Sequence, residues 1–358
     1  MTHPLILAAS RMDASPADVI SRLDRAEGLI ARAAGQGAQI AVLPELFNSG
    51  YVYSDQNYEI AETVSGTTAR WLKRTSRAYH IYIAGSFLLR EPDGIYNAMY
   101  LVAPNGQTWR YDKSCPWAFE RAFFRPRKNP IQIAKTYLGN IGMLICADVS
   151  RAKLWAQYAG KVDLMLVSSC PPLIHRVDFH LPDGRVIHPR ELGPVFKAAY
   201  RNADEIFGEL FLKQTRWLGV PSVNTTGAGD FKSPLPRPAA TLSSFFALRP
   251  DLWKYVLQAN QVTVSSGYYD ETFIADASGH VIAKTKNNHD DLAVSTVHLS
   301  DETPKPIGHQ PAFGLNASVY LMDRFVNALM VPYYNRHWQM NPDSSFSAPD
   351  KERSDLSL

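Results

Sequence analysis

The chain has 358 residues, of which 46% are hydrophobic and 20% are charged. This balance excludes a disordered or fibrous protein and is typical of a globular chain with a sizeable core. Its net charge of +3 comes from 37 basic and 34 acidic residues without a dense basic block, so no nucleic-acid partner is indicated.

Targeting and metal-binding signals are also lacking in the sequence. No segment approaches the roughly 18 apolar residues of a membrane-spanning helix, and the start MTHPLILAAS has no cationic leader region. We therefore expect a cytoplasmic protein without a membrane partner. Three cysteines, at 115, 146 and 170, predict neither a disulfide framework nor a zinc site.

The first predicted helix spans residues 15–35. Ser15 is a favourable N-cap residue, Pro16 suits the first helical position, and Gly35 suits the end of a helix. An apolar stripe runs through this segment, and a short glycine-containing turn follows it. The segment therefore predicts an amphipathic helix packed on a sheet.

The later segments repeat this alternation of helix and apolar strand. Residues 96–113 predict a hairpin with Asn105-Gly106 at its turn, and 268–285 predict another. Such alternation is typical of an α/β protein whose sheets are covered by helices. Further helices are expected at 67–80, 150–160 and 203–219, and further strands at 40–44, 81–89, 140–148, 162–169 and 219–224.

Composition divides the chain into a main domain and an extension. The main domain spans residues 1–300 and contains an insertion at 225–265, which has four prolines and interrupts the alternation. Residues 301–358 form a C-terminal extension, whose end from about 341 is polar and has little to bury.

Three residues at the ends of predicted strands could carry chemistry. Glu45 follows an apolar strand, Lys113 ends a hairpin strand, and Cys146 ends an apolar strand. The carboxyl ends of strands are where α/β enzymes place reactive groups. Taken singly, each has an ordinary structural explanation, because buried cysteines, solvated lysines and glutamates in the first turn of a helix are all common.

Taken together, the motifs around these residues resemble those of the nitrilase superfamily of carbon-nitrogen hydrolases. The glutamate lies in LPELFNSGY, the lysine ends the strand from Gly106 to Lys113, and the cysteine ends the pattern GMLIC. All three motifs occur in the order that the superfamily shows. Asp112 stands where the superfamily usually has arginine.

This resemblance implies a fold and a catalytic triad. The fold would be a four-layer αββα sandwich, in which two sheets pack face to face beneath outer helices. Cys146 would be the nucleophile and Glu45 the general base, while Lys113 and the backbone N–H of Ala147 would form the oxyanion hole. Glu120 occupies the place of the superfamily's second glutamate and would orient the lysine, although an exposed acid is the alternative. No metal or other cofactor is required.

The resemblance leaves the substrate partly open. The superfamily includes amidases, N-carbamoyl amidohydrolases and nitrilases. Nitrilases usually have Cys-Trp-Glu at the nucleophile, whereas this chain has Cys146-Ala147-Asp148, so a small amide is favoured. Residues that flank the triad in sequence are expected to bind substrate, with packing as an equally open alternative. They are Tyr51, Trp117, Phe119 and Cys170.

The function favoured by the sequence is hydrolysis of a non-peptide C–N bond through a thioester. An amide would release ammonia or an amine, and nitrile or N-carbamoyl substrates remain alternatives. A hypothesis of another class is a non-catalytic scaffold that uses the proline-rich insertion as a contact surface. The absence of one triad residue would favour this hypothesis, but all three are present. The superfamily also implies a homodimer or larger homo-oligomer, with the segment from Pro306 exchanged between subunits.

Overall fold

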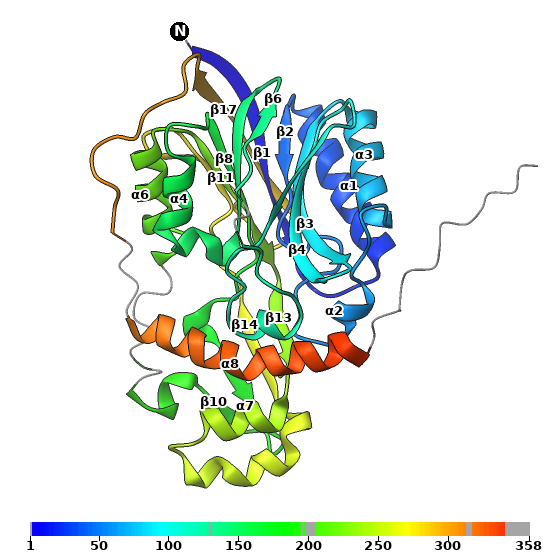
Figure 1. Cartoon of the computed structure of the whole chain (residues 1–358), viewed down its shortest axis with the longest axis vertical. Coiled ribbons are helices and arrows are strands. Elements are labelled where there is room, and N and C mark those ends of the chain that lie inside the picture. Colours follow the sequence, from blue (N-terminus) through cyan, green and yellow to red (C-terminus); the bar gives the residue numbers. More distant parts are fainter. Residues whose placement is uncertain (1, 129–130, 195–196, 198–204, 313–316, 341–358) are drawn as a thin grey trace, which may run out of the picture.

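Two β-sheets packed face to face form the centre of the molecule in the computed structural model (Figure 1). The structure describes residues 2–128, 131–194, 197, 205–312 and 317–340. The first sheet contains, in spatial order, β12 (Thr226–Ala228), β1 (Thr2–Asp13), β2 (Ile40–Val42), β3 (Tyr82–Glu91), β4 (Gly94–Val102) and β5 (Thr108–Asp112), and β17 (Asp291–Ser300) also pairs with β1.

The second sheet has the same mixed character as the first. Its strands are, in spatial order, β16 (Val281–Lys284), β15 (Phe273–Ala275), β11 (Ser222–Asn224), β8 (Leu164–Ser168), β7 (Gly139–Ile145) and β6 (Ala134–Thr136). The central strands β7, β8 and β11 run parallel, as β1, β2 and β3 do in the first sheet. Because parallel strands need crossover connections, helices cover the outer faces.

Each sheet carries a helical layer on its outer face (Figure 1). The first sheet is covered by α1 (Val19–Gly35) and α3 (Thr67–Tyr79), and the second by α4 (Ala152–Tyr158) and α6 (Glu209–Leu218). Strand β1 shows the cause, since Leu5, Leu7 and Ala9 belong to the core between the sheets while Ala8 and Met12 pack with the α1 and α3 side chains. The predicted four-layer αββα sandwich is thereby confirmed.

Several predicted boundaries are wrong. Helix α1 begins after Asp18, whose carboxylate accepts a hydrogen bond from the Ser21 amide at 2.9 Å, and Ser15 is not the cap. The chain before Asp18 is held outside the helix, since the amide of Tyr51 donates to the Ala14 carbonyl at 2.9 Å. Similarly, the strand predicted at 140–148 ends at Ile145, where a 3-10 turn begins.

Helix α6 also begins later than expected. It starts at Glu209 rather than at 203, and residues 201–204 of the predicted cap region lie outside the described residues. The hairpin of β4 and β5 agrees with its prediction, and Gly106 at its turn has φ of +88°. The shorter helices are α2 (Gln56–Glu59) and the 3-10 helices η1 (Ala118–Ala122), η2 (Cys146–Ser150), η3 (Ile174–Arg176) and η4 (Pro189–Leu192).

A small lobe lies at one end of the sandwich (Figure 1). Its sheet has the order β10 (Val186–Ile187), β9 (Asp178–His180), β14 (Thr263–Gly267) and β13 (Asp230–Pro234), and its helices are α7 (Pro238–Phe245) and the 3-10 helix η6 (Pro250–Gln261). The predicted insertion 225–265 contributes most of the lobe. Its first residues do not belong there, because β12 pairs with β1 in the sandwich.

The C-terminal extension forms helix α8 (Ala317–Met340), which crosses between the sandwich and the small lobe (Figure 1). Its side chains Val326, Met330 and Tyr334 are buried on this same chain. The predicted polar tail from 341 lies outside the described residues. Among the helices that the structure describes, none is long and apolar enough to cross a membrane. The homo-oligomer remains a prediction.

Candidate active site

Cys146 is the first residue of the 3-10 helix η2 and follows β7 directly. Its backbone has φ of +46°, a left-handed conformation that is unusual for a residue with a Cβ atom. Its side chain is buried, with 4% of its surface exposed. Strain of this kind is held in place by its surroundings and is concentrated at functional sites. The turn therefore presents the thiol at the end of β7, where Cys146 lines a cavity.

Glu45 reaches the same place from the first sheet. It follows β2, its amide donates to the Ser169 carbonyl at 3.3 Å, and the next residue, Leu46, also has a positive φ of +53°. Its carboxylate is buried, and Oε1 accepts a hydrogen bond from Asn97 Nδ2 at 2.7 Å. The other oxygen, Oε2, is buried without a hydrogen-bond partner among the described residues.

Lys113 lies between two carboxylates and is fully buried. Its Nζ is 2.7 Å from Glu45 Oε1, 2.8 Å from Glu120 Oε1 and 2.7 Å from Glu120 Oε2. A buried lysine is expensive unless it is paired, and two carboxylates supply that pairing here. The structure thus brings Glu45, Lys113, Glu120 and Cys146 together, from four separate segments of the chain.

Glu120 is locked in place by the turn that carries it. Its Oε2 accepts the Trp117 amide at 2.7 Å, and its Oε1 accepts the hydroxyl of Tyr51 at 2.5 Å. With 2% of its surface exposed, it is a buried acid rather than the exposed one considered as the alternative. These bonds hold the Glu120 carboxylate beside Lys113 and attach it to its own turn and to Tyr51.

Two positioning residues, Asn97 and Asp148, were not found from the sequence. Asn97 holds Glu45, as described above. Asp148 is fully buried and accepts hydrogen bonds from the Cys115 amide at 2.7 Å and the Tyr111 hydroxyl at 2.9 Å. It therefore ties the turn after the nucleophile to the loop after Lys113. The sequence signal for Asn97 was a polar residue inside an apolar strand, and the signal for Asp148 was an acid two residues after the cysteine.

Asp112, the departure from the superfamily pattern, takes part in an ion-pair network at the end of β5. Its carboxylate is 2.6 Å from Arg110 Nε and 2.7 Å from Arg127 Nε. Both arginines also pair with Glu91. The Arg127 amide donates to the Lys113 carbonyl at 3.1 Å, so the network supports the backbone of the lysine.

Burial and the neighbouring charges set the protonation of the cluster. Burial raises the pKa of Glu45 to about 7, although Lys113 opposes the increase. Burial and the Glu45 carboxylate raise the pKa of the Cys146 thiol well above its ordinary value. Burial alone would lower the pKa of Lys113, yet attraction to Glu120 and Glu45 outweighs it and raises the pKa well above the ordinary lysine value.

These shifts describe a neutral thiol beside a base that is ionised near neutral pH. The ammonium of Lys113 stays positive, because its pKa is raised. The Cys146 thiol and the Glu45 carboxylate each shift the pKa of the other, so both groups belong to one buried cluster. The arrangement can deprotonate a thiol as it attacks a carbon and can hold the negative charge that develops.

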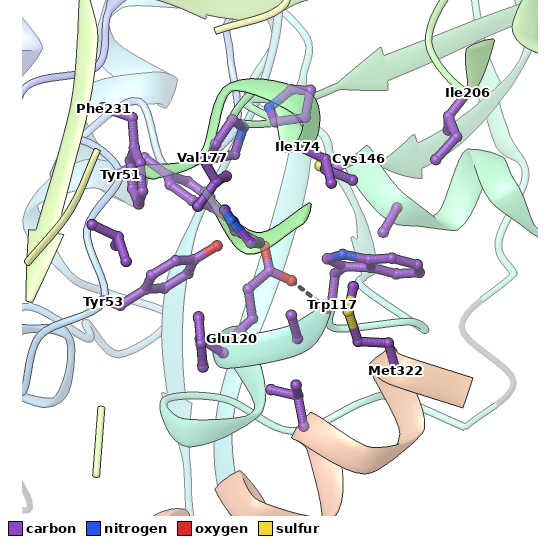
Figure 2. A pocket seen from close by; sticks show the side chains of 18 of the residues that line it. Tyr51, Tyr53, Trp117, Glu120, Cys146, Ile174, Val177, Ile206, Phe231 and Met322 are labelled. Atoms are coloured by element: carbon purple, nitrogen blue, oxygen red, sulfur yellow. Dashed lines mark hydrogen bonds between the residues drawn. The ribbon is translucent and has the colours of Figure 1, made fainter. Parts of the chain in front are cut away.

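A cavity of about 130 Å³ opens onto Cys146, Ala147 and Glu120. Figure 2 shows Glu120 and Cys146 on its inner wall, with Met322 reaching in from α8. Three of the residues expected to bind substrate, Tyr51, Trp117 and Phe119, line this cavity.

Cys170, the fourth residue expected to bind substrate, is not among the described lining residues. Its Sγ lies 2.5 Å from where a Cβ on Gly227 would be, so Cys170 is a packing residue between β12 and the loop after β8. Its neighbours Pro171 and Pro172 line the cavity in its place.

Helix α8 completes one wall of the site, which the sequence did not predict. Met322 and Val326 line the cavity. Between them, Asp323 Oδ1 accepts the amide of Ala118 at 2.8 Å, at a residue whose φ is +47°. This bond holds the start of η1, the turn that carries Glu120. No group of three or more acidic, histidine or cysteine side chains capable of holding a metal ion occurs in the described part of the chain.

Known proteins resemble this chain in sequence and in fold. The family model described as carbon-nitrogen hydrolase matches residues 6–182. A nitrilase from Pyrococcus abyssi is 33% identical over 127 residues, which cover 35% of this chain and 48% of the relative. An omega-amidase from Danio rerio is 33% identical over 156 residues, covering 40% of this chain and 56% of the relative. The chain thus spans about half the length of the curated relatives it matches.

Solved structures extend the likeness of the fold beyond this matched part. An amidase from Nesterenkonia superposes with a TM-score of 0.59 at 18% identity, covering 84% of this chain and 91% of the amidase. The fold is a four-layer αββα sandwich that carries a buried glutamate-lysine-cysteine cluster beside a cavity. More particularly, residues 6–182 match the carbon-nitrogen hydrolase family, and the relatives that share this likeness in sequence include a nitrilase and an omega-amidase.

Proposed function

We propose that this protein is an amidase, which hydrolyses a small non-peptide amide through a thioester on Cys146. The observation that carries the proposal is the buried cluster in which Lys113 Nζ lies 2.7 Å from Glu45 and from Glu120, beside the strained Cys146 turn. The cavity in front of the thiol is the place for the substrate.

In the first half of the reaction, Glu45 accepts the thiol proton while Sγ of Cys146 forms a bond to the amide carbon. The carbonyl oxygen becomes an oxyanion, which Lys113 and the N–H of Ala147 stabilise by about 3 to 4 kcal/mol per donor in comparable sites. The C–N bond then breaks as the carboxyl group of Glu45 donates its proton to the departing nitrogen. Ammonia or an amine leaves, and the acyl group remains on sulfur.

In the second half, Glu45 removes a proton from water while the water oxygen attacks the thioester carbon. The C–S bond breaks, the carboxylic acid leaves, and the proton held by Glu45 returns to the sulfur of Cys146. Throughout both halves, Glu120 holds Lys113 in position and Asn97 holds Glu45 in position. The raised pKa of Glu45 suits this role, since one group must both take and give protons near neutral pH.

Nitrile hydrolysis is the second candidate, favoured by the likeness to the Pyrococcus nitrilase. Hydrolysis of an N-carbamoyl compound is a narrower alternative on the same residues. A panel of simple amides, N-carbamoyl amino acids and nitriles separates them by measured ammonia release. We expect amides to be turned over, and we expect Cys146→Ala and Glu45→Gln to abolish turnover while remaining folded. Undiminished turnover in either variant would contradict the proposal.

A further inference from the structure

The cavity in front of Cys146 has an apolar wall that comes from elements beyond the catalytic strands. The small lobe contributes Phe179, Phe231 and Phe245, and α8 contributes Met322 and Val326. The rings interlock: Phe119 and Phe245 stack with centroids 6.1 Å apart, and Phe179 meets Phe245 edge-on at 5.6 Å. Because these rings pack against one another, their side chains have little freedom to rearrange around a ligand, and they present apolar surface to it.

Two of the polar side chains on the wall already have partners. The Tyr51 hydroxyl donates to Glu120, and the Ser150 hydroxyl donates to the Ala147 carbonyl at 2.7 Å. Lys113 is fully buried behind its two carboxylates. Among the described residues that line the cavity, none is lysine, arginine or histidine. Glu120 is the only carboxylate among the lining residues that the structure describes, and it would repel an anion.

We propose that the substrate's acyl group is uncharged and apolar, and that the small lobe and α8 select it; this inference rests on the proposed function. A carboxylate on the acyl chain would lose its hydration against these rings without gaining a cation. The 2-oxoglutaramate amidase of Bacillus subtilis, a relative 35% identical over 71 residues, is named for a substrate that carries such a carboxylate. The present cavity is built for the opposite chemistry.

The size of the cavity limits the acyl group. An apolar cavity of about 150 Å³ accommodates benzene. The 130 Å³ here therefore suits a branched aliphatic chain or a single ring. Two amides of nearly equal shape isolate charge from size: 5-methylhexanamide, which ends in an isopropyl group, and glutaramate, which ends in a carboxylate on the same three-methylene chain.

The test measures binding and turnover separately. Binding of both amides to the Cys146→Ala variant by calorimetry reports on the cavity, and Cys146-dependent ammonia release from the wild type reports on the reaction. We expect 5-methylhexanamide to bind about 100-fold more tightly than glutaramate. Equal binding, or tighter binding of glutaramate, would overturn the inference. Selective binding without turnover of any amide would overturn the proposed function alone.

A charge introduced into the wall provides the second test. Val177 is half-buried and lines the cavity, so an arginine can be accommodated there with its head toward the ligand. In the Cys146→Ala background, Val177→Arg is expected to raise glutaramate affinity at least tenfold, whereas the matched Val177→Met change is not. Failure of the arginine variant, with its fold intact by circular dichroism, would overturn the assignment of this cavity to the acyl group.

Discussion

The titration of Glu45 gives a quantitative prediction for both activity and stability. Burial raises its pKa from the ordinary 4.5 to about 7. Because only the ionised carboxylate can accept the thiol proton, kcat/KM for an amide should rise with pH through a midpoint near 7. Below that midpoint the rate constant should fall about tenfold for each pH unit.

The same pKa predicts how stability changes with pH. The folded pKa of Glu45 lies above its unfolded value, so between pH 4.5 and 7 the folded chain keeps a proton that the unfolded chain has released. The stability that Glu45 contributes by holding this proton in the folded chain is complete below pH 4.5 and is lost as pH rises through 7. A shift from 4.5 to about 7 is equivalent to a loss of about 3 kcal/mol in the free energy of unfolding.

Urea unfolding of the wild type and of Glu45→Gln, measured from pH 4.5 to 8.5, tests this linkage. The variant should gain stability relative to the wild type by about 3 kcal/mol across that range. Glu62→Gln is the matched control, because Glu62 is a partly buried acid that accepts the Thr68 amide outside the cluster, and it should keep the rate midpoint near 7. A constant stability difference together with a rate midpoint near 4.5 would refute the reasoning.

Three further substitutions test the supporting residues. Asp148→Ala removes the acceptor of the Cys115 amide, so it should lower kcat about 100-fold with little change in KM. Steady-state kinetics that show a change in KM alone would contradict the positioning role of Asp148. Asp323→Ala should lower the free energy of unfolding by about 1 to 3 kcal/mol and should also lower kcat, because the Ala118 amide loses its partner. An unchanged kcat would show that α8 does not influence the reaction. Cys170→Ala should retain wild-type kcat, and a large loss would return that thiol to the site.

The motifs that resemble the nitrilase superfamily indicate Glu45, Lys113 and Cys146 in the sequence, and the positions of the strands explain why these residues meet. Glu45, Lys113 and Cys146 each follow a strand, and the ends of strands meet at one edge of the sandwich. The regular elements were predictable because their hydrophobic periods are clear. The start of α1 was missed because a long-range bond between Tyr51 and Ala14 keeps the preceding segment out of the helix.

The apolar wall of the cavity could not be predicted from the sequence. Its members come from the small lobe and α8, whose placement depends on tertiary packing rather than on local pattern. Phe231 and Met322 are ordinary apolar residues in the sequence, and nothing in their spacing shows that they face one cavity. For Cys170 the sequence predicted a cavity residue that the structure does not place there. Its position shortly after β8 suggested the cavity, but its side chain packs against Gly227 instead.

The most direct test of the central claim is to trap the acyl-enzyme. The protein is mixed with an amide that it turns over, quenched in acid within one turnover, digested, and examined by mass spectrometry. The account predicts an acyl group on Cys146 and none on Cys115 or Cys170, with no adduct in Cys146→Ala. Turnover without an adduct on Cys146, or an adduct on either other cysteine that forms and decays at the turnover rate, would contradict it.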